Sequence, residues 1–324
     1  MGIRHLNRYL RDNCSESIRC INLSELSGKK IVVDISIYLY KYEAEDALLE
    51  NMYVMLSIFN HYNITPIFVF DGKPPPEKKA LLQKRREDKE NAQEEYDNLQ
   101  KQLESKTEED DKQEIISAMI LLKKQLVQIN KEKIESVKSL IRAFGATYYD
   151  APGEADELCA MLVIKKKVWA CLSEDMDLFV YGCTRVLRYF SIMAHTVVLY
   201  YTKGILEELK MTQKEFKEIC VLSGTDYNMN ANGNNDKVNL KLTMRHFKKF
   251  KESESKDFYE WLLANTSYIN DIQILNKIND MFNLQEEREK LAIFNKIKIA
   301  NGPVRQEEIE EIMKQEDFMF CKYK

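Results

Sequence analysis

Four groups of acidic residues lie directly beside apolar runs or Pro/Gly turns in this chain. They are Asp34 in IVVDIS, Asp71 in IFVFDGK, Glu154 and Asp156 in APGEADE, and Asp175 and Asp177 in LSEDMD. Burying an unpaired carboxylate costs several kcal/mol, so carboxylates normally avoid apolar surroundings. A bound divalent cation keeps such groups ionised, and four groups of this kind therefore predict one convergent metal site in an enzyme.

The chemistry that suits such a site is displacement at phosphorus. Mg²⁺ binds carboxylate oxygens and waters, with few direct carboxylates per ion. Two ions about 4 Å apart activate a water and stabilise the leaving oxygen of an in-line displacement. This demands carboxylates from several segments, and Asp226 adds one more to the four groups. The four histidines are isolated, and no Cys, His or Ser arrangement competes. We expect two Mg²⁺ ions, with Mn²⁺ as a substitute.

The apolar runs that precede these carboxylates have the length of strands. Residues 31–37 and 64–70 are β-branched or aromatic runs, and a helical pattern at 44–62 separates them. Strand, helix and strand at this spacing predict a parallel pair, and 168–173 and 185–190 are further strand candidates. Open α/β sheets bind ligands at the carboxyl ends of their strands, where Asp34, Asp71 and Asp175 fall. The predicted fold is α/β, with a mostly parallel central sheet flanked by helices.

Residues 77–144 have a different composition from the rest of the chain. They contain no Gly or Pro and are rich in Lys, Glu and Gln. We therefore expect them to be helical, with a break near 107–112. One interpretation is a helical hairpin packed on itself or on a partner as a short coiled coil. The other is a helical arch over the site, favoured by its position after Asp71. A basic amphipathic helix is expected near 238–250.

Composition restricts the class of protein. The chain has 324 residues with 44% apolar content, enough for a substantial core, and no run long enough to span a membrane. Seven cysteines without a CxxC pair indicate a reducing, intracellular compartment. The net charge of −4 does not indicate nucleic-acid binding, but carboxylates kept for metal mask basic patches in such a total.

Six short motifs occur in an order that resembles the flap endonuclease/XPG family of structure-specific 5′ nucleases. They are MGI at the start, VVD ending at 34, VFDGKPP at 69–75, APGEAD at 151–156, EDMD at 174–177 and GTDY at 224–227. The resemblance covers roughly residues 1–250. It implies a PIN-like 5′ nuclease fold with a helical arch and a C-terminal helical duplex-binding element. It also implies Mg²⁺-dependent hydrolysis of phosphodiester bonds near single-strand/double-strand DNA junctions, in replication and repair.

The resemblance assigns roles to particular residues. The metal positions would be Asp34, Asp71, Glu154, Asp156, Asp175, Asp177 and Asp226. Asp156 stands where the family has Glu, so its reach is one methylene shorter, and Glu157 is an alternative ligand. Glu154 and Asp156, two positions apart, would face different ways on a regular helix. Lys78 and Arg85 match a basic pair at the base of the arch, where a cation neutralises charge developing on the scissile phosphate.

The resemblance also assigns DNA contacts. Tyr40 matches a tyrosine that stacks on the terminal base, although Tyr38 or Tyr42 could serve instead. Gly2 would let the N-terminal backbone approach the junction. The family's duplex-binding loop carries Gly-x-Gly, where backbone amides and a K⁺ ion meet a phosphate; here only Gly233 is present, so K⁺ binding is not established. Basic residues that could bind the phosphates of the duplex follow the loop, at Lys237, Lys241, Arg245, Lys248 and Lys249.

The expected organisation has four parts. Residues 1–105 would form the N-terminal nuclease region with the start of the arch, 106–140 the rest of the arch, 141–227 the internal nuclease region, and 228–324 the duplex-binding and C-terminal helices. We expect a monomer that binds branched or 5′-flap DNA in the nucleus or at sites of DNA replication. DFMF at 317–320 is a poor match to a sliding-clamp motif, so clamp binding is not supported.

Three other functions compete with a 5′ nuclease on branched DNA. A 5′→3′ exonuclease of DNA or RNA would use the same carboxylates, and the 2′-hydroxyl can be sensed by a few contacts that leave no motif. A non-catalytic DNA-binding protein with a nuclease-like fold would be expected to lose carboxylates or the basic pair, and this chain keeps both. A coiled-coil interaction protein built on residues 77–144 leaves the acidic groups unexplained.

Overall fold

The chain divides into two compact units. One comprises Met1–Ile35, Ile58–Lys78 and Thr147–Asn301, and the other Ser36–Ser57, Lys79–Ala146 and Gly302–Lys324. The computed structural model describes residues 3, 5–105, 109–227, 239–269, 271–284, 294–314, 318 and 320. The first unit contains the whole central sheet and all seven carboxylates expected to bind metal.

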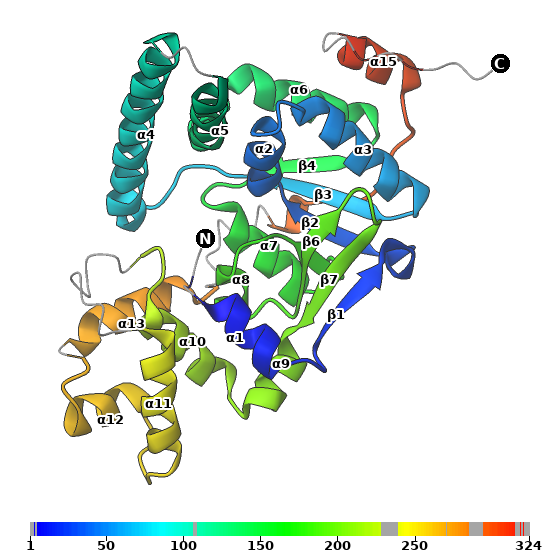
Figure 1. Ribbon diagram of the computed structural model, residues 1–324. Coiled ribbons are helices and arrows are strands. Elements are labelled where there is room, and N and C mark those ends of the chain that lie inside the picture. The colour runs from blue at the N-terminus through cyan, green and yellow to red at the C-terminus, as the bar shows by residue number, and fades with distance from the viewer. Residues whose placement is uncertain are drawn as a thin grey trace. The chain divides into compact units, whose positions relative to one another are not determined.

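A seven-stranded sheet forms the centre of the first unit, in the order β1-β7-β6-β5-β2-β3-β4 (Figure 1). The four pairings from β6 through β5, β2 and β3 to β4 are parallel, while β7 pairs antiparallel with β1 and β6. The strands are β1 (Ile18–Asn22), β2 (Lys30–Asp34), β3 (Thr65–Phe70), β4 (Thr147–Asp150), β5 (Ala170–Leu172), β6 (Arg185–Ser191) and β7 (Thr196–Tyr201). The predicted mostly parallel sheet is confirmed, whereas β1, β4 and β7 were not predicted.

The first predicted strand ends earlier than its sequence suggests. It was expected over 31–37, but β2 stops at Asp34 and α2 (Ile35–Glu43) begins at the next residue. The buried side chains of α2 are Ile35, Tyr38, Leu39 and Tyr42, each at most 4% exposed. Their spacing of three and four is helical, and it outweighs the β-branched side chains at 35 and 37. Asp34 is therefore the last residue of its strand.

Four helices of the first unit surround the strands: α1 (Leu6–Asn13), α7 (Ala155–Ile164), α8 (Asp177–Val180) and α9 (Thr202–Leu209). Helix α7 packs on β2, β3 and β5. Its side chains are apolar almost all the way round, as expected of a helix enclosed in a core, and Cys159 and Leu162 are fully buried. Helix α7 therefore presents its N-terminus to the carboxyl ends of the parallel strands.

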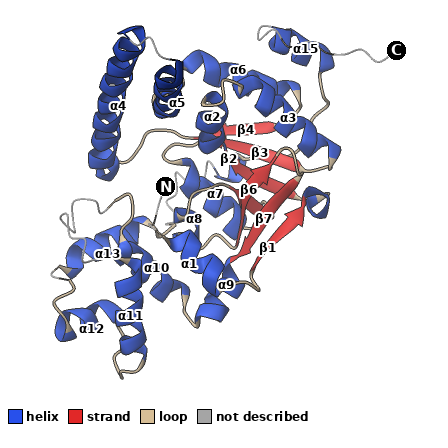
Figure 2. Ribbon diagram, viewed as in Figure 1, coloured by secondary structure: helices blue, strands red, loops and turns tan. Residues whose placement is uncertain are grey.

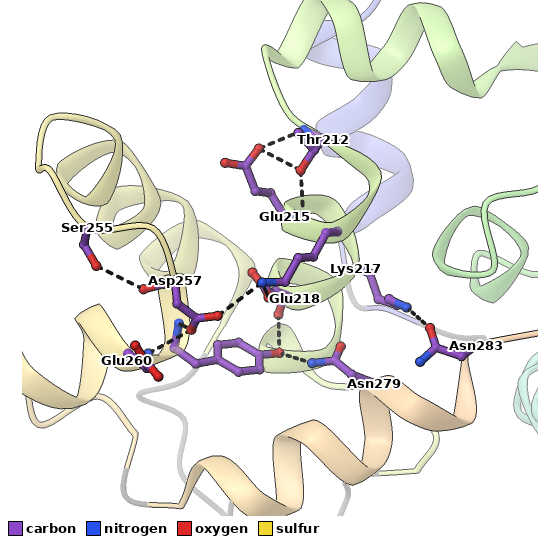
Figure 3. Close-up of polar contacts among 11 residues, drawn as sticks. Thr212, Glu215, Lys217, Glu218, Ser255, Asp257, Glu260, Asn279 and Asn283 are labelled. Atoms are coloured by element: carbon purple, nitrogen blue, oxygen red, sulfur yellow. Dashed lines mark hydrogen bonds and ion pairs between the residues drawn. The ribbon is translucent and has the colours of Figure 1, made fainter.

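After the sheet, the described residues of the first unit form helices, among them α10 (Gln213–Ser223), α11 (Leu240–Lys251), α12 (Phe258–Asn265) and α13 (Ile272–Met281), as Figure 2 shows. Helix α11 confirms the basic helix predicted near 238–250. Polar contacts join α10 to its neighbours (Figure 3): the Tyr259 hydroxyl donates to the Glu218 carbonyl at 2.9 Å and accepts from Asn279 at 3.1 Å. Lys214 Nζ lies 3.3 Å from Glu218 and 3.2 Å from Asp257.

Glu218→Gln should change how the stability of the protein depends on pH. Burial raises the pKa of Glu218 above its ordinary value, against the opposing effect of Lys214. The folded chain then holds this proton more tightly than the unfolded chain, so wild-type stability falls as pH rises from about 4.3 through the folded pKa. Between pH 4 and pH 8 the variant should gain about 1 kcal/mol relative to wild type, measured by urea denaturation.

A matched control for this prediction lies on the preceding helix. Glu207 forms the same i,i+4 pair with Lys203 at 3.6 Å, but both side chains are exposed. Glu207→Gln should leave the pH profile of the unfolding free energy unchanged. Parallel profiles for wild type and Glu218→Gln would contradict the prediction.

The second unit is built from helices: α2, α3 (Leu48–His61, up to Ser57), α4 (Lys79–Ser105), α5 (Glu109–Gln125), α6 (Lys131–Ala143) and α15 (Gln306–Lys314). Helices α4 and α5 pack on each other, and Lys89 donates to the Val127 carbonyl at 2.8 Å. The predicted helical character of this stretch is confirmed, with α4 described up to Ser105 and α5 from Glu109. None of the helices formed by the described residues is long and apolar enough to cross a bilayer.

The C-terminal segment of the second unit packs on the same unit. Arg305 donates to the Arg142 carbonyl at 2.7 Å, at the end of α6. The rings of Phe318 and Phe320 lie 5.5 and 5.6 Å from that of Tyr53. The two aromatic residues of DFMF therefore contribute to intramolecular packing.

Candidate metal centre

The end of β3 meets the start of α7 through a close backbone approach. The Gly72 N–H donates to the Gly153 carbonyl at 2.7 Å, and a Cβ on Gly72 would lie 2.0 Å from the Ala151 carbonyl oxygen. Only glycine fits this contact. Asp71, one residue earlier, is exposed and accepts a hydrogen bond from the Ala155 N–H at 2.8 Å. The strand end thereby places Asp71 beside the segment that carries Glu154 and Asp156.

A serine joins the carboxylates at the ends of β2 and β5. The fully buried Ser173 hydroxyl donates to Asp34 Oδ2 at 2.8 Å and accepts from the Asp175 N–H at 3.0 Å. Asp175 Oδ1 in turn accepts from the Asp177 N–H at 3.0 Å. Three candidate ligands from two strand ends thus form one hydrogen-bonded chain. Ser173 was not predicted, and its only sequence signal is its position in LSEDMD.

Two of the carboxylates are deeply buried near other negative charges. Burial, followed by the charges of Asp175 and Glu154, raises the pKa of Asp156 well above its ordinary value. Burial, followed by the charges of Asp175 and Asp226, does the same to the pKa of Asp177. The charge of Asp34 also raises the pKa of Asp156, and the charge of Asp156 also raises the pKa of Asp177. Six of the predicted carboxylates thus interact electrostatically with or through Asp156 and Asp177, and Asp71 accepts a hydrogen bond at the start of α7.

Lys78 supplies a cation to this acidic cluster. It ends the short 3₁₀ turn Pro76–Lys78, is 8% exposed, and places Nζ 2.7 Å from Glu154 and 3.9 Å from Asp226. Burial by itself would lower the pKa of Lys78, but the charges of Asp156, Glu154 and Asp226 outweigh burial and raise it. Lys78 is therefore held as an ammonium group among the carboxylates.

Tyr227 is a further member of the cluster that was not assigned a role from the sequence. Its hydroxyl donates to Glu154 Oε2 at 2.7 Å, and its ring lies 4.9 Å from Lys78 Nζ. Burial raises the pKa of Tyr227, which keeps the hydroxyl protonated as a donor. Tyr227 therefore orients Glu154 and Lys78 together. Its position next to Asp226 in GTDY was the only available signal.

Glu154 lies at the N-cap of α7 with extended backbone angles, φ −76° and ψ 148°. The argument that Glu154 and Asp156 face different ways on a regular helix does not apply, because Glu154 precedes the helix. Glu157 donates its N–H to Asp156 Oδ1 at 2.7 Å, so it helps to orient Asp156 through its backbone.

The donor set suits a hard cation. Both carboxylate oxygens of Asp177 are buried without a hydrogen-bond partner, which is costly unless another ligand satisfies them. Over the part of the chain that the structure describes, no three His, Cys, Asp or Glu side chains converge closely enough to enclose an ion by themselves. A site of this kind fits Mg²⁺, which keeps several waters and takes one or two carboxylates directly.

The predicted DNA contacts are distributed over both units. Arg85 lies on α4 and Tyr40 on α2, in the second unit. Tyr40 is 52% exposed, whereas Tyr38 and Tyr42 are each 1% exposed, so Tyr40 is the one of the three tyrosines with a ring available for stacking. Gly2, Gly233 and Lys237 lie outside the described residues.

Helices α1 and α11 of the first unit line a groove of about 810 Å³. Its walls include three of the predicted phosphate contacts, Lys241, Arg245 and Lys248, together with Arg8 and His5 from α1. Lys249 is on the same helix but does not line the groove. The cations from α11 are thereby joined by a basic residue of the first helix.

Comparison with known proteins identifies relatives of the chain. Family models of the XPG N-terminal domain and the XPG I-region match residues 1–92 and 145–226. Flap endonuclease 1-A of Oryza sativa subsp. japonica is 32% identical over 281 residues, covering 80% of this chain and 71% of that protein. Flap endonuclease 1 of Glossina morsitans morsitans is 32% identical over 246 residues, covering 70% and 61%.

Solved structures share the fold. The catalytic core of Rad2 in complex with DNA substrate has a TM-score of 0.64 at 19% identity, covering 97% of this chain and 95% of that one. Flap endonuclease-1 from Methanococcus jannaschii has a TM-score of 0.61 at 23% identity, covering 93% and 91%. The predicted 5′ nuclease fold is thereby confirmed.

Proposed function

This chain belongs to the flap endonuclease/XPG family, and on that premise we propose that it is a Mg²⁺-dependent, structure-specific 5′ nuclease. It hydrolyses phosphodiester bonds near single-strand/double-strand DNA junctions, in replication and repair, in the nucleus or wherever the DNA is replicated. The observation that carries the proposal is the group of buried, mutually repelling carboxylates at the carboxyl ends of the strands, with the cation of Lys78 paired to Glu154 and Asp226 among them.

The carboxylates that would hold metal are Asp34, Asp71, Glu154, Asp156, Asp175, Asp177 and Asp226. Mg²⁺ bound there supplies Lewis-acid stabilisation of phosphoryl oxygens and lowers the pKa of a bound water. The ammonium group of Lys78 contributes positive charge for the scissile phosphate, and the resemblance assigns the same role to Arg85. Tyr227 and Ser173 hold Glu154 and Asp34 by hydrogen bonds, so these carboxylates are oriented before substrate arrives.

We assign the remaining parts of the chain by the same resemblance. Residues 1–105 form the N-terminal nuclease region with the start of the arch in α4, 106–140 form the rest of the arch, and 141–227 form the internal nuclease region. The region from 228 to 324 contains the duplex-binding element and the C-terminal helices. The matches to the XPG N-terminal domain and I-region support this division, because the first ends at residue 92 within α4, the second begins at 145, and the C-terminal helices follow both.

The test is incubation of the purified protein with labelled 5′-flap, nicked and single-stranded DNA, in Mg²⁺ or in EDTA. Cleavage at the flap base that requires Mg²⁺ is the expected result. Release of mononucleotides from a nicked 5′ end, without cleavage at the flap base, would identify a 5′→3′ exonuclease instead. No Mg²⁺-dependent product from any substrate would contradict the proposal.

The groove between α1 and α11 is proposed to hold the phosphate backbone of the duplex. Arg245→Ala and Lys248→Ala should each weaken duplex binding, and each should reduce the slope of log affinity against log salt by about 1. Lys251→Ala is the matched control, because Lys251 is on the same helix but its Nζ is bound to Glu215 at 2.9 Å. Fluorescence anisotropy at several salt concentrations measures both quantities, and unchanged slopes for the groove variants would rule out the assignment.

A further inference from the structure

The segment Glu174–Asp177 carries two of the candidate metal ligands, Asp175 and Asp177. It follows β5, and only Asp177 at its end belongs to a helix. Two hydrogen bonds, from the Asp175 N–H to Ser173 and from the Asp177 N–H to Asp175, orient the two aspartates relative to each other. Through Ser173 they also link Asp175 to Asp34 on β2, but they do not include the side chains of Glu174 and Met176.

A buried arginine on β6 holds these two residues. Arg188 is 6% exposed, and its Nη2 donates to the Glu174 carbonyl at 2.9 Å and lies 3.4 Å from the Glu174 carboxylate. Its Nη1 lies 2.9 Å from the Met176 sulfur. One guanidinium group thus contacts the residues on both sides of Asp175. The neighbouring Tyr189 N–H adds a hydrogen bond to Glu174 Oε1 at 2.5 Å.

The same guanidinium group also reaches the first helix. Arg188 Nη1 donates to Asn7 Oδ1 at 2.6 Å, and the Tyr200 hydroxyl donates to the same oxygen at 2.8 Å. Asn7 Nδ2 completes the network by donating to the Tyr189 hydroxyl at 2.6 Å. Arg188 therefore joins the metal-bearing segment, strand β6 and helix α1.

Stability alone does not account for this arrangement. A buried ion pair is usually matched or surpassed in stability by apolar residues of similar volume. Arg188 Nε is moreover buried without a hydrogen-bond partner. What an apolar side chain could not supply is a rigid set of donors aimed at a carbonyl, a carboxylate and an amide at once.

We propose that Arg188 is a positioning residue for the metal site. It holds Glu174 and Met176 in place, and thereby fixes the orientation of Asp175 and Asp177 before metal binds. Residues that orient ligands in this way typically change metal affinity or activity by 10- to 100-fold, as an order of magnitude. This inference rests on the proposed function, because it requires that the acidic cluster binds metal.

The test measures metal binding directly, without DNA. Mn²⁺ binding to the full chain, followed by electron paramagnetic resonance, should be about 10–100-fold weaker in Arg188→Met and in Arg188→Lys. Lysine at position 188 should not restore the Mn²⁺ affinity, because an ammonium group cannot reproduce the contacts that the planar guanidinium makes to Glu174 and Asn7. In cleavage assays the variants should need more Mg²⁺ for half-maximal rate but approach the wild-type rate at saturation.

Two further variants keep the test decisive. Arg185→Met is the matched control, because Arg185 is on the same strand but its guanidinium lies over two aromatic rings. Its Cζ is 5.0 Å from the ring centroid of Trp169 and 5.7 Å from that of Tyr201. It should bind Mn²⁺ like wild type. If Arg188→Met fails to fold, Glu174→Gln, which keeps the backbone contact and weakens the ion pair, should still lower the affinity measurably.

The outcomes are separable. Wild-type Mn²⁺ affinity in folded Arg188→Lys and Glu174→Gln would overturn the inference and leave the proposed function intact. Equal weakening in Arg185→Met would also overturn it, because the effect would then be general to β6. Failure of the wild-type protein itself to bind Mn²⁺ would overturn the proposed function, and the inference with it.

Discussion

Asp175→Ala should reduce Mg²⁺-dependent cleavage of a 5′-flap duplex by about 10³-fold or more. Its charge raises the pKa of both Asp156 and Asp177, and its Oδ1 accepts a hydrogen bond from the Asp177 N–H at 3.0 Å. Carboxylates that hold a catalytic cation contribute several kcal/mol of transition-state stabilisation, and each 1.36 kcal/mol is about tenfold in rate. Single-turnover cleavage of labelled flap DNA at saturating Mg²⁺ measures the effect.

The loss of activity should occur without loss of the fold. Removing Asp175 relieves repulsion with Asp156 and Asp177, so the Tm of the metal-free variant in EDTA should equal or exceed that of wild type. Asp175→Asn, which keeps an oxygen for the Asp177 N–H, should be as inactive as the alanine variant. Glu207→Ala removes a carboxylate from the exposed face of α9 and should cleave normally. A cleavage rate within about threefold of wild type in Asp175→Ala would exclude this residue from the metal site.

Lys78→Ala should lower the single-turnover cleavage rate by about 10²–10³-fold while weakening DNA binding much less. Removing one group that stabilises developing charge typically has an effect of this size. Lys78 is buried against Glu154 and Asp226 and cannot serve as a general surface contact for DNA. The comparison of rate and affinity should be made at saturating Mg²⁺, because the substitution also removes a cation from among the carboxylates.

Arg85→Ala extends the same experiment to the second member of the basic pair. It should also slow cleavage more than it weakens binding. Lys203→Ala removes an equal charge from an exposed pair on α9 and should change neither quantity. If affinity alone falls in the Lys78 and Arg85 variants, the two residues hold the DNA backbone and do not contribute to the chemical step.

Much of the metal site follows from the sequence because its ligands are tied to strand ends. The carboxyl ends of parallel strands meet at one edge of a sheet. Once their strands were recognised, Asp34, Asp71 and Asp175 could therefore be predicted to lie at the same edge. Glu154 and Asp156 were assigned to the same site from their position at the start of a helix, which is α7. The main local error, a strand extended to residue 37, arose because β-branched residues there also fit the buried face of α2.

The sequence alone determined which segments bring carboxylates to the site, since apolar periodicity is local and parallel pairing places the strand ends together. The tertiary structure decided which other residues serve that site. Ser173 on Asp34, Tyr227 on Glu154 and Arg188 on Glu174 and Asn7 are contacts between segments distant in sequence. Their partners depend on side-chain directions within a packed core, and no local pattern in the chain specifies those directions.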